Sequence, residues 1–176
     1  YALWGEPLAG TAEQIRTITE LAAAAGRPAP TFQVAFRPIL GRTEEEAWEK
    51  AYSTVARIQD RTKGGVQLTR RHKLTDPENA GSQRLLAIAE QGERHDRALW
   101  TVTAKATGGA GNSTALVGTP ETVAAALMDY YDLGVRILSA RGYDLLEDAR
   151  EFGREVIPLV RAEVAKRDAA QQAVPA

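Results

Sequence analysis

Short apolar stretches alternate with longer helical patterns along this chain. Residues 1–4, 31–40, 114–117 and 135–139 match β-strands, and apolar residues at helical spacing follow each of them, over about residues 11–25, 43–61, 119–133 and 144–166. Strands that are joined by helices pair in parallel, so the pattern predicts an α/β fold built from four strand–helix units. Chemistry in such folds gathers at the carboxyl ends of the strands.

Helix-start signals sharpen the predicted helices. They are Thr11 with Gln14, Thr43 with Glu46, Thr119 ahead of Pro120, and Asp144 with Glu147. We therefore expect the first helix to begin at Thr11 and to bury Leu21 on its apolar face. The last helix is expected to bury Leu146 and Ala149, and Pro158 should kink or divide it because proline cannot continue the hydrogen-bond ladder.

The stretch at residues 31–40 alternates in a way that assigns its two faces. Its apolar set is Phe32, Val34 and Phe36, and its other set is Gln33, Ala35 and Arg37. In a barrel the apolar set faces the surrounding helices, which places Arg37 near the mouth of the lumen, and Pro38 is expected to end regular pairing. A surface arginine at a strand end is an equally good interpretation of the same pattern.

Residues 62–113 form the least regular part of the sequence. Hydrophobic periodicity disappears over residues 61–79, which predicts an insertion or mobile loop whose basic run at 70–73 either binds an anion or is simply solvated. Helices are expected at 82–91 and 97–106, with His95 as a polar residue at a helix end. The glycine-rich segment 107–113 suits either a phosphate-binding loop or a hinge or lid.

Aromatic and acidic residues at the start of the second helix have two interpretations. Trp48 and Tyr52 recur at helical spacing, which favours core packing over a stacking platform. The three consecutive glutamates, 44–46, invite a metal site, but acidic residues in a first helical turn are already explained by the helix dipole. We therefore expect no metal site.

Composition narrows the partner classes. The chain has 176 residues, 44% of them hydrophobic, which is enough for a buried core in one domain. A net charge of −1 disfavours nucleic acid and anionic membranes as partners, and the absence of cysteine excludes disulfides and thiolate chemistry. No long apolar run occurs, so we expect a cytoplasmic protein. The chain starts inside a predicted strand without a methionine, and we expect it to be a piece of a longer protein.

Four segments, taken together and in order, resemble a known family. They are YALWGEP at residues 1–7, RTEEEAW at 42–48, TALVGTP at 114–120 and GYDLLED at 142–148. The chain is similar to the bacterial luciferase-like flavin-dependent monooxygenases, and within them to the alkanesulfonate monooxygenase branch. The resemblance implies a TIM-type (β/α)8 barrel of which this chain, as the single domain 1–176, is the C-terminal half with strands five to eight, and 62–113 is a variable insertion and mobile loop region.

The resemblance also implies an activity. Reduced FMN (FMNH2) comes from a separate NAD(P)H-dependent flavin reductase, oxygen adds to it, and the peroxyflavin attacks an alkanesulfonate or other small organosulfur substrate. The enzyme is expected to be a homo-oligomer. Two alternatives remain open: an F420-dependent oxidoreductase of the same superfamily, which forms no peroxide, and an inactive half-barrel that needs a partner chain.

Candidate site residues follow from the same resemblance. Trp4 matches a tryptophan at the tip of strand five, and Tyr143 matches an active-site tyrosine after strand eight, whose phenol can donate a hydrogen bond to developing negative charge. Arg141 and Gly142 precede it and are expected to contact the cofactor. Arg37, with Tyr143 and Trp4, completes the expected catalytic set.

Two positions depart from the family pattern. On strand six the alkanesulfonate enzymes carry arginine and histidine where this chain has Ala35 and Arg37, and Arg37 can supply the missing guanidinium from the next residue on the same face. Before the glycine-rich loop the family carries an arginine where this chain has Thr107, and Lys105 can replace that cation. The expected substrate and lid residues are Lys105, Thr107, Gly108, Gly109, Asn112 and Ser113.

Overall fold

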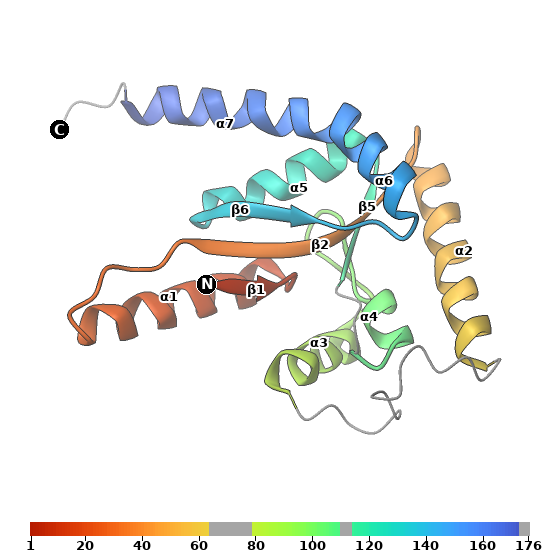
Figure 1. The fold of residues 1–176 in the computed structure, drawn as a ribbon, viewed down its shortest axis with the longest axis horizontal. Helices are drawn as coiled ribbons and strands as arrows, with labels where there is room; N and C mark the ends of the chain where they lie inside the picture. Colours follow the sequence, from red (N-terminus) through yellow and green to blue (C-terminus); the bar gives the residue numbers. More distant parts are fainter. Residues whose placement is uncertain (64–78, 110–113, 173–176) are drawn as a thin grey trace.

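A computed structural model of the chain describes residues 1–63, 79–109 and 114–172 (Figure 1). In chain order its elements are β1 (Ala2–Trp4), α1 (Leu8–Ala24), β2 (Phe32–Leu40), α2 (Glu44–Lys63), α3 (Ala80–Gln91), β3 (Arg94–His95), β4 (Leu99–Trp100), α4 (Val102–Ala106), β5 (Ala115–Gly118), α5 (Pro120–Asp132), β6 (Val135–Ala140), α6 (Leu145–Glu151), the π-helix η1 (Phe152–Val156) and α7 (Ile157–Gln172). The four predicted strands and the helices that follow them are all present. The basic run 70–73 lies outside the described residues.

Strand β2 is the central strand of the sheet and pairs with β1, β5 and β6. Its odd-numbered residues bond along one edge, where Gly5 N–H donates to Ala35 O and Arg37 N–H donates to Thr114 O, each at 3.1 Å. Along the other edge Arg141 N–H donates to Phe36 O, also at 3.1 Å. Thus β1 and then β5 pair with successive parts of one edge of β2, and β6 pairs with the opposite edge, all in parallel.

The strand order differs from the expected one, in which the last two strands of the chain would be neighbours in the sheet. The unit β5–α5–β6 is a parallel crossover, as predicted, but its two strands both pair with β2 and not with each other. Because β1 has three residues, the second half of its edge of β2 is available to the four residues of β5. The result is a curled sheet of α/β type.

Pro38 does not end pairing, contrary to expectation. It pairs with Leu116 of β5, and β2 continues to Leu40. The backbone N–H and C=O groups of even-numbered β2 residues point toward β6. The pairing with β6 ends at Phe36, so the nitrogen of Pro38 points toward an edge where β6 no longer pairs. A proline is tolerated there because the position needs no donor.

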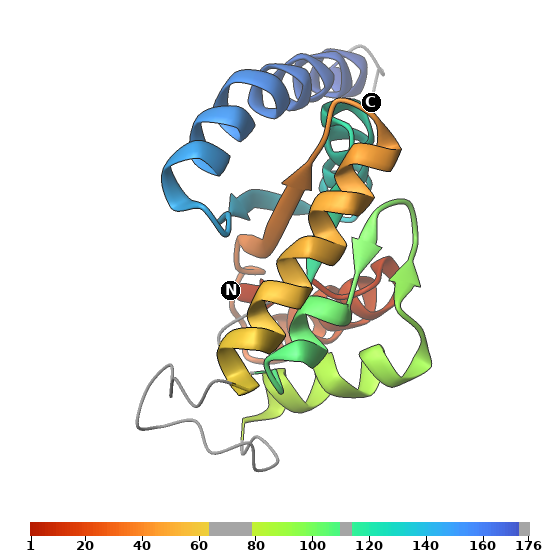
Figure 2. The same cartoon turned by 90° about the vertical axis from the view of Figure 1, so that its right-hand side faces the viewer.

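Two hydrophobic clusters cover opposite faces of β2 and β5. Phe32, Val34 and Phe36 pack against α1, α5 and the η1–α7 segment, as the alternation predicted. The other cluster covers Ile39, Ala115 and Val117 with Ala47, Ala51 and Val55 of α2 and with Trp100. In Figures 1 and 2, α2 begins beside the carboxyl end of β2 and runs toward α3 and α4. The core therefore comprises two layers, with β2 and β5 between them.

The first helix begins earlier than predicted. α1 starts at Leu8, directly after Pro7, and Thr11 is a buried residue inside its first turn, so no capping box forms there. The Leu8 N–H instead donates to Asp96 Oδ2 at 2.9 Å, from 88 residues along the chain. A carboxylate at a helix start is favourable for the same dipole reason as a local cap.

The predicted helix at 97–106 is wrong for its first half. Residues Arg94–His95 and Leu99–Trp100 form an antiparallel hairpin, and only Val102–Ala106 is helical. Asp96 has φ of 49°, a left-handed conformation that Asp tolerates in turns. Leu99 and Trp100 enter different hydrophobic clusters, which consecutive strand residues on opposite faces can do. His95 lies in this hairpin and not at a helix end.

Some predicted buried residues are exposed. Leu21 and Leu146 are 61% and 58% exposed, and Ala149 is exposed as well. Leu21 belongs to the last turns of α1, and the carboxyl-terminal half of this helix extends past β1 in Figure 1. Leu146 lies in the first turn of α6, where no element covers it within the described residues.

The last helix is divided, as Pro158 predicted. α6 gives way to the π-helical turn η1, in which Ile157 N–H bonds to Phe152 O, and α7 then begins just before the proline. A π-turn is one way in which a helix absorbs a break in its ladder. Among the helices of the described residues none combines the length and apolarity that crossing a membrane requires.

Candidate active site

Arg37 lies at the carboxyl end of the β2–β6 pairing, on the face opposite to the apolar set. Its Nη1 donates to Gly142 O at 3.1 Å, and its guanidinium carbon lies 5.3 Å from the centre of the Tyr143 ring. Burial lowers the pKa of Arg37, Tyr143 partly offsets this, and the neighbouring charge of Arg141 lowers it further. An arginine remains charged even so, which makes this a half-buried cation.

Tyr143 follows β6 and packs its ring against the second hydrophobic cluster. Its hydroxyl oxygen is buried and makes no hydrogen bond of good geometry within the described residues. Burial raises the pKa of this phenol, and the nearby Thr103 hydroxyl and Arg37 counteract that effect in part. The site thus holds a neutral O–H donor next to a fixed positive charge.

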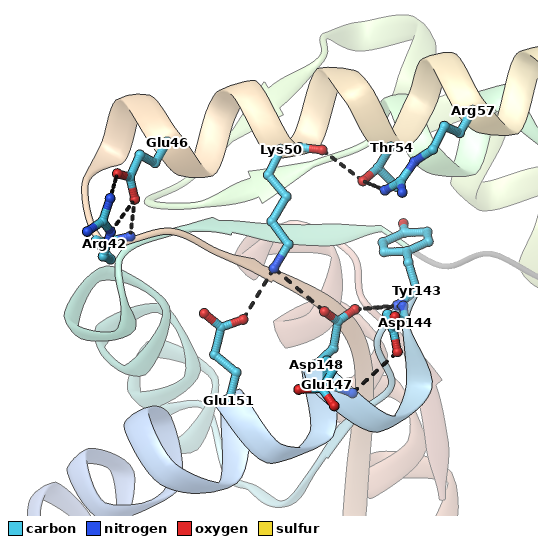
Figure 3. A network of polar contacts seen from close by, with 10 residues as sticks. All are labelled: Arg42, Glu46, Lys50, Thr54, Arg57, Tyr143, Asp144, Glu147, Asp148 and Glu151. Carbon is cyan, nitrogen blue, oxygen red and sulfur yellow. Dashed lines mark hydrogen bonds and ion pairs between the residues drawn. The ribbon is translucent and has the colours of Figure 1, made fainter.

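The loop that presents Tyr143 is held by one carboxylate. Asp148 Oδ2 accepts from the N–H of Tyr143 at 2.7 Å and from that of Asp144 at 3.0 Å (Figure 3). Asp144 caps α6 by accepting from Glu147 N–H at 3.3 Å, so the predicted cap is confirmed, but the residue that reaches back is Asp148 and not Glu147.

Trp4 lies on the same face of the sheet as Arg37. It pairs with Ala35, which is two residues before Arg37 on β2, and its side chain is 44% exposed. A Cβ at Gly81 would come within 2.8 Å of the Trp4 Nε1, so α3 lies directly against the indole. The fold therefore places Trp4, Arg37 and Tyr143 on one face, with Trp4 at the open part of it.

The expected lid residues lie at the end of α4. Lys105 is exposed, and the Thr107 hydroxyl bonds back to the carbonyls of Thr103 and Ala104. The N–H groups of Gly108 and Gly109 donate to Lys105 O and Ala104 O, at 3.0 and 2.9 Å, in the pattern of a helix C-cap. Both glycines have positive φ, which suits this cap. Their amides are therefore engaged and cannot wrap a phosphate in this arrangement.

Asn112 and Ser113 lie outside the described residues. The lid function of the whole segment therefore stays a prediction. The link from α4 to the site in the described part of the chain is Thr103, which lies near the Tyr143 hydroxyl.

Three residues of this neighbourhood were not predicted from the sequence. Asp148, Lys50 and Thr103 come from α6, α2 and α4, and Lys50 Nζ lies 3.6 Å from Asp148 Oδ1. The one signal in the sequence was Asp148 itself, an acidic residue four positions after the Asp144 cap. The first-turn glutamates have other partners: Glu44 accepts from Thr119 N–H and Thr122, and Glu46 pairs with Arg42.

The arrangement suits an anion or developing negative charge on oxygen. A half-buried guanidinium and a phenol that stays protonated supply two hydrogen-bond donors to one region. Within residues 1–63, 79–109 and 114–172 no group of three His, Asp or Glu side chains is placed to hold a metal ion.

Comparisons with known proteins concern the family and the fold of the chain. The family model described as luciferase-like monooxygenase matches residues 1–136. Similar solved structures include a riboflavin lyase (RcaE) with modified FMN and riboflavin, at TM-score 0.62 and 21% identity over 92% of this chain. DmoA from Hyphomicrobium sulfonivorans matches at TM-score 0.61 and 19% identity, and the EDTA monooxygenase EmoA from Chelativorans sp. BNC1 at 0.55 and 16%, each over 92% of this chain. The chain covers 38%, 37% and 42% of these three structures, respectively.

Proposed function

The chain belongs to the luciferase-like monooxygenase family, and from this premise we propose that it forms part of a reduced-flavin-dependent monooxygenase. The enzyme uses O2 to oxidise an alkanesulfonate or another small organosulfur anion. The chain provides the C-terminal half of a (β/α)8 barrel. The parallel pairing of β1, β5 and β6 with β2 and the coverage of about two fifths of the similar structures support this, although β6 pairs with β2 and not with β5.

The observation that carries this proposal is the pairing of Arg37 with Tyr143. The guanidinium lies over the ring, and the phenol hydroxyl is buried without a hydrogen bond of good geometry in the described residues. The Thr103 hydroxyl lies near this phenol, and an acceptor on a ligand would complete the hydrogen bonding of the buried O–H. Tyr143 follows the carboxyl end of β6, and Arg37 lies where β2 passes that end, which is the kind of place where ligands bind in α/β folds.

The residues fit a flavin as the cofactor. FMN, bound as FMNH2, supplies the electrons that activate O2. Arg141 and Gly142 lie at the tip of β6, and Trp4 offers an exposed indole on the same face as Arg37, so these three are the residues proposed to contact the ring system and its substituents.

Each remaining site residue has a role that its environment supports. Tyr143 donates its O–H to negative charge that develops on oxygen, which requires the neutral phenol that burial favours. Arg37 binds the anionic group of the substrate. The apolar cluster around Ile39 and Trp100 excludes water from one side of the pair. Lys105, Thr107, Gly108, Gly109, Asn112 and Ser113 are proposed to contribute to substrate binding.

The remaining parts of the proposal follow from the family. The FMNH2 comes from a separate NAD(P)H-dependent flavin reductase, and the enzyme is a cytoplasmic homo-oligomer. Residues 1–176 act as one domain, with 62–113 as its variable region.

The proposal is tested by anaerobic titration of the purified protein with FMNH2 and with reduced F420, followed by oxygen uptake on adding an alkanesulfonate. We expect FMNH2 to bind and O2 to be consumed in a substrate-dependent way. Activity with F420 alone, or the absence of flavin binding, contradicts the proposal.

The role of Arg37 has a separate test. Arg37→Gln should raise the KM for an alkanesulfonate by about tenfold or more, because a charge-assisted hydrogen bond contributes about 1.5–3 kcal/mol. Arg42→Gln is the matched control, since Arg42 is exposed and pairs only locally with Glu46. An equal KM in Arg37→Gln, or a preference of the unmodified protein for an uncharged substrate, removes Arg37 from substrate binding.

A further inference from the structure

The carboxylate of Asp148 organises the loop between β6 and α6. One oxygen accepts from two consecutive backbone N–H groups, those of Tyr143 and Asp144, and the side chain is only 12% exposed. Hydrogen bonds to an ionised carboxylate are among the stronger ones in proteins. Two of them on adjacent residues fix the direction of the loop backbone.

Gly142 allows this close approach. A Cβ at Gly142 would lie 2.2 Å from Asp148 Cβ and 2.4 Å from Oδ2, so no larger residue fits while Asp148 keeps its position. The carbonyl of Gly142 is the acceptor for Arg37 Nη1 at 3.1 Å. The loop backbone that Asp148 fixes therefore also fixes the acceptor that holds Arg37 beside Tyr143.

Lys50 holds the other side of the carboxylate. Its Nζ lies 3.6 Å from Asp148 Oδ1 and 3.2 Å from Glu151 Oε2, and Figure 3 shows it reaching from α2 across to both. The side chain of Lys50 is 40% exposed, so this contact supports Asp148 and is not a buried ion pair.

We propose that Asp148 is a positioning residue for the Arg37–Tyr143 pair, with Lys50 as its support. In this role the carboxylate acts through the backbone of residues 142–144. This inference rests on the proposed function only for its effect on turnover, because the geometry it concerns belongs to the chain itself.

The charged groups around Tyr143 give the proposal a spectroscopic signature. Arg37 faces the phenol from β2 and Asp148 from α6, with Thr103 as the polar neighbour from α4. The negative charge of Asp148 raises the pKa of Tyr143, and the positive charge of Arg37 lowers it. Removing only the charge at position 148 should therefore lower the pKa of Tyr143.

The test uses Asp148→Asn and Asp148→Ala in the whole chain without flavin. Asp148→Asn keeps an oxygen that can accept both N–H groups, so amide exchange at Tyr143 and Asp144 should stay within about threefold of the unmodified protein. The pKa of Tyr143 should fall in this variant, as measured by tyrosine ¹³Cζ NMR. Asp148→Ala removes the acceptor and should speed exchange at both amides by about tenfold or more. Glu147→Gln, at the adjacent exposed carboxylate, should change neither.

Two results overturn the inference: unchanged exchange at both amides in Asp148→Ala, or an unchanged pKa of Tyr143 in Asp148→Asn. If Asp148→Ala does not fold, Asp148→Leu, which keeps a side chain of similar shape without the acceptor, takes its place in the exchange measurement, and unchanged exchange at both amides overturns the inference. Where the unmodified protein turns over, Asp148→Ala should lower kcat, and Asp148→Asn should restore most of it. A protein that binds no flavin contradicts the proposed function and leaves the exchange and pKa results standing, so the two failures are distinguishable.

Discussion

Tyr130 and Tyr143 are two phenols whose pKa is raised above 10.0, in each case chiefly by burial. In the unfolded chain they ionise near pH 10, whereas in the folded chain they ionise at a higher pH, so folding becomes less favourable as the pH rises from the unfolded pKa toward the folded one. Each phenol contributes a slope of up to about 1.4 kcal/mol per pH unit. Urea unfolding between pH 8 and pH 11 should show a falling free energy, with a smaller slope in Tyr130→Phe. If the free energy of unfolding falls with pH equally steeply in Tyr130→Phe and in the unmodified protein, burial does not raise the pKa of Tyr130 as described.

Gly142 provides a second prediction at the residue scale. Gly142→Ala should destabilise the fold by about 1–3 kcal/mol, because its Cβ overlaps Asp148. Gly153→Ala is the matched control: Gly153 lies in the η1 turn with nothing within 4 Å of an added Cβ, and this change should be neutral or stabilising by up to about 1 kcal/mol. Equal free energies of unfolding for the two variants would show that the contact with Asp148 imposes no restriction.

Glu6 and Arg84 join two elements that are far apart in the sequence. Glu6 is 2% exposed, and Arg84 of α3 donates to both of its carboxylate oxygens, at 2.8 and 2.7 Å. Arg84→Met leaves a buried carboxylate without its partner and should cost about 3 kcal/mol. Urea unfolding measures this, with Arg97→Met, whose exposed pair with Asp129 should contribute under about 1 kcal/mol, as control. Similar losses in the two variants would contradict a special role of the Glu6–Arg84 pair, in which only the carboxylate is buried.

Local patterns predicted most elements, and tertiary contacts explain the failures. The alternation in β2 and the caps at Thr119 and Asp144 are properties of neighbouring residues, so they were readable from the sequence. The start of α1 depends on Asp96, and the β3–β4 hairpin depends on β5, with which β4 pairs. Such partners lie too far along the chain for periodicity to indicate them.

The candidate site was predictable in the same limited sense. Arg37 follows from its place on a strand, and Tyr143 follows from the family resemblance, and the structure brings the two together. Asp148 and Lys50 could not be predicted, because an acidic residue in the first turns of a helix and a lysine on another helix are ordinary surface features until the fold places them 3.6 Å apart. The lid prediction extends into residues that are not described.

At the scale of the whole molecule, the face of the sheet that carries Arg37 is only partly covered. Trp4 pairs with Ala35 and Ile137 pairs with Gln33, so both side chains lie on this face. Trp4 is 44% exposed and Ile137 is 49% exposed. Exposed apolar sheet surface promotes association, so the chain should self-associate, and Ile137→Ser should weaken this. Sedimentation velocity over a range of concentrations measures the effect. A monomer at every concentration would contradict the expectation.

The central claim is that the Arg37–Tyr143 pair serves a flavin-dependent oxygenation. The most direct measurement is substrate-dependent O2 uptake with FMNH2 by the unmodified protein, by Tyr143→Phe, and by Tyr52→Phe as a control at an exposed tyrosine. We predict that Tyr143→Phe lowers kcat by about 10²-fold or more, as the loss of one donor to developing charge does elsewhere, and that Tyr52→Phe retains full turnover. Unchanged turnover in Tyr143→Phe would contradict the claim.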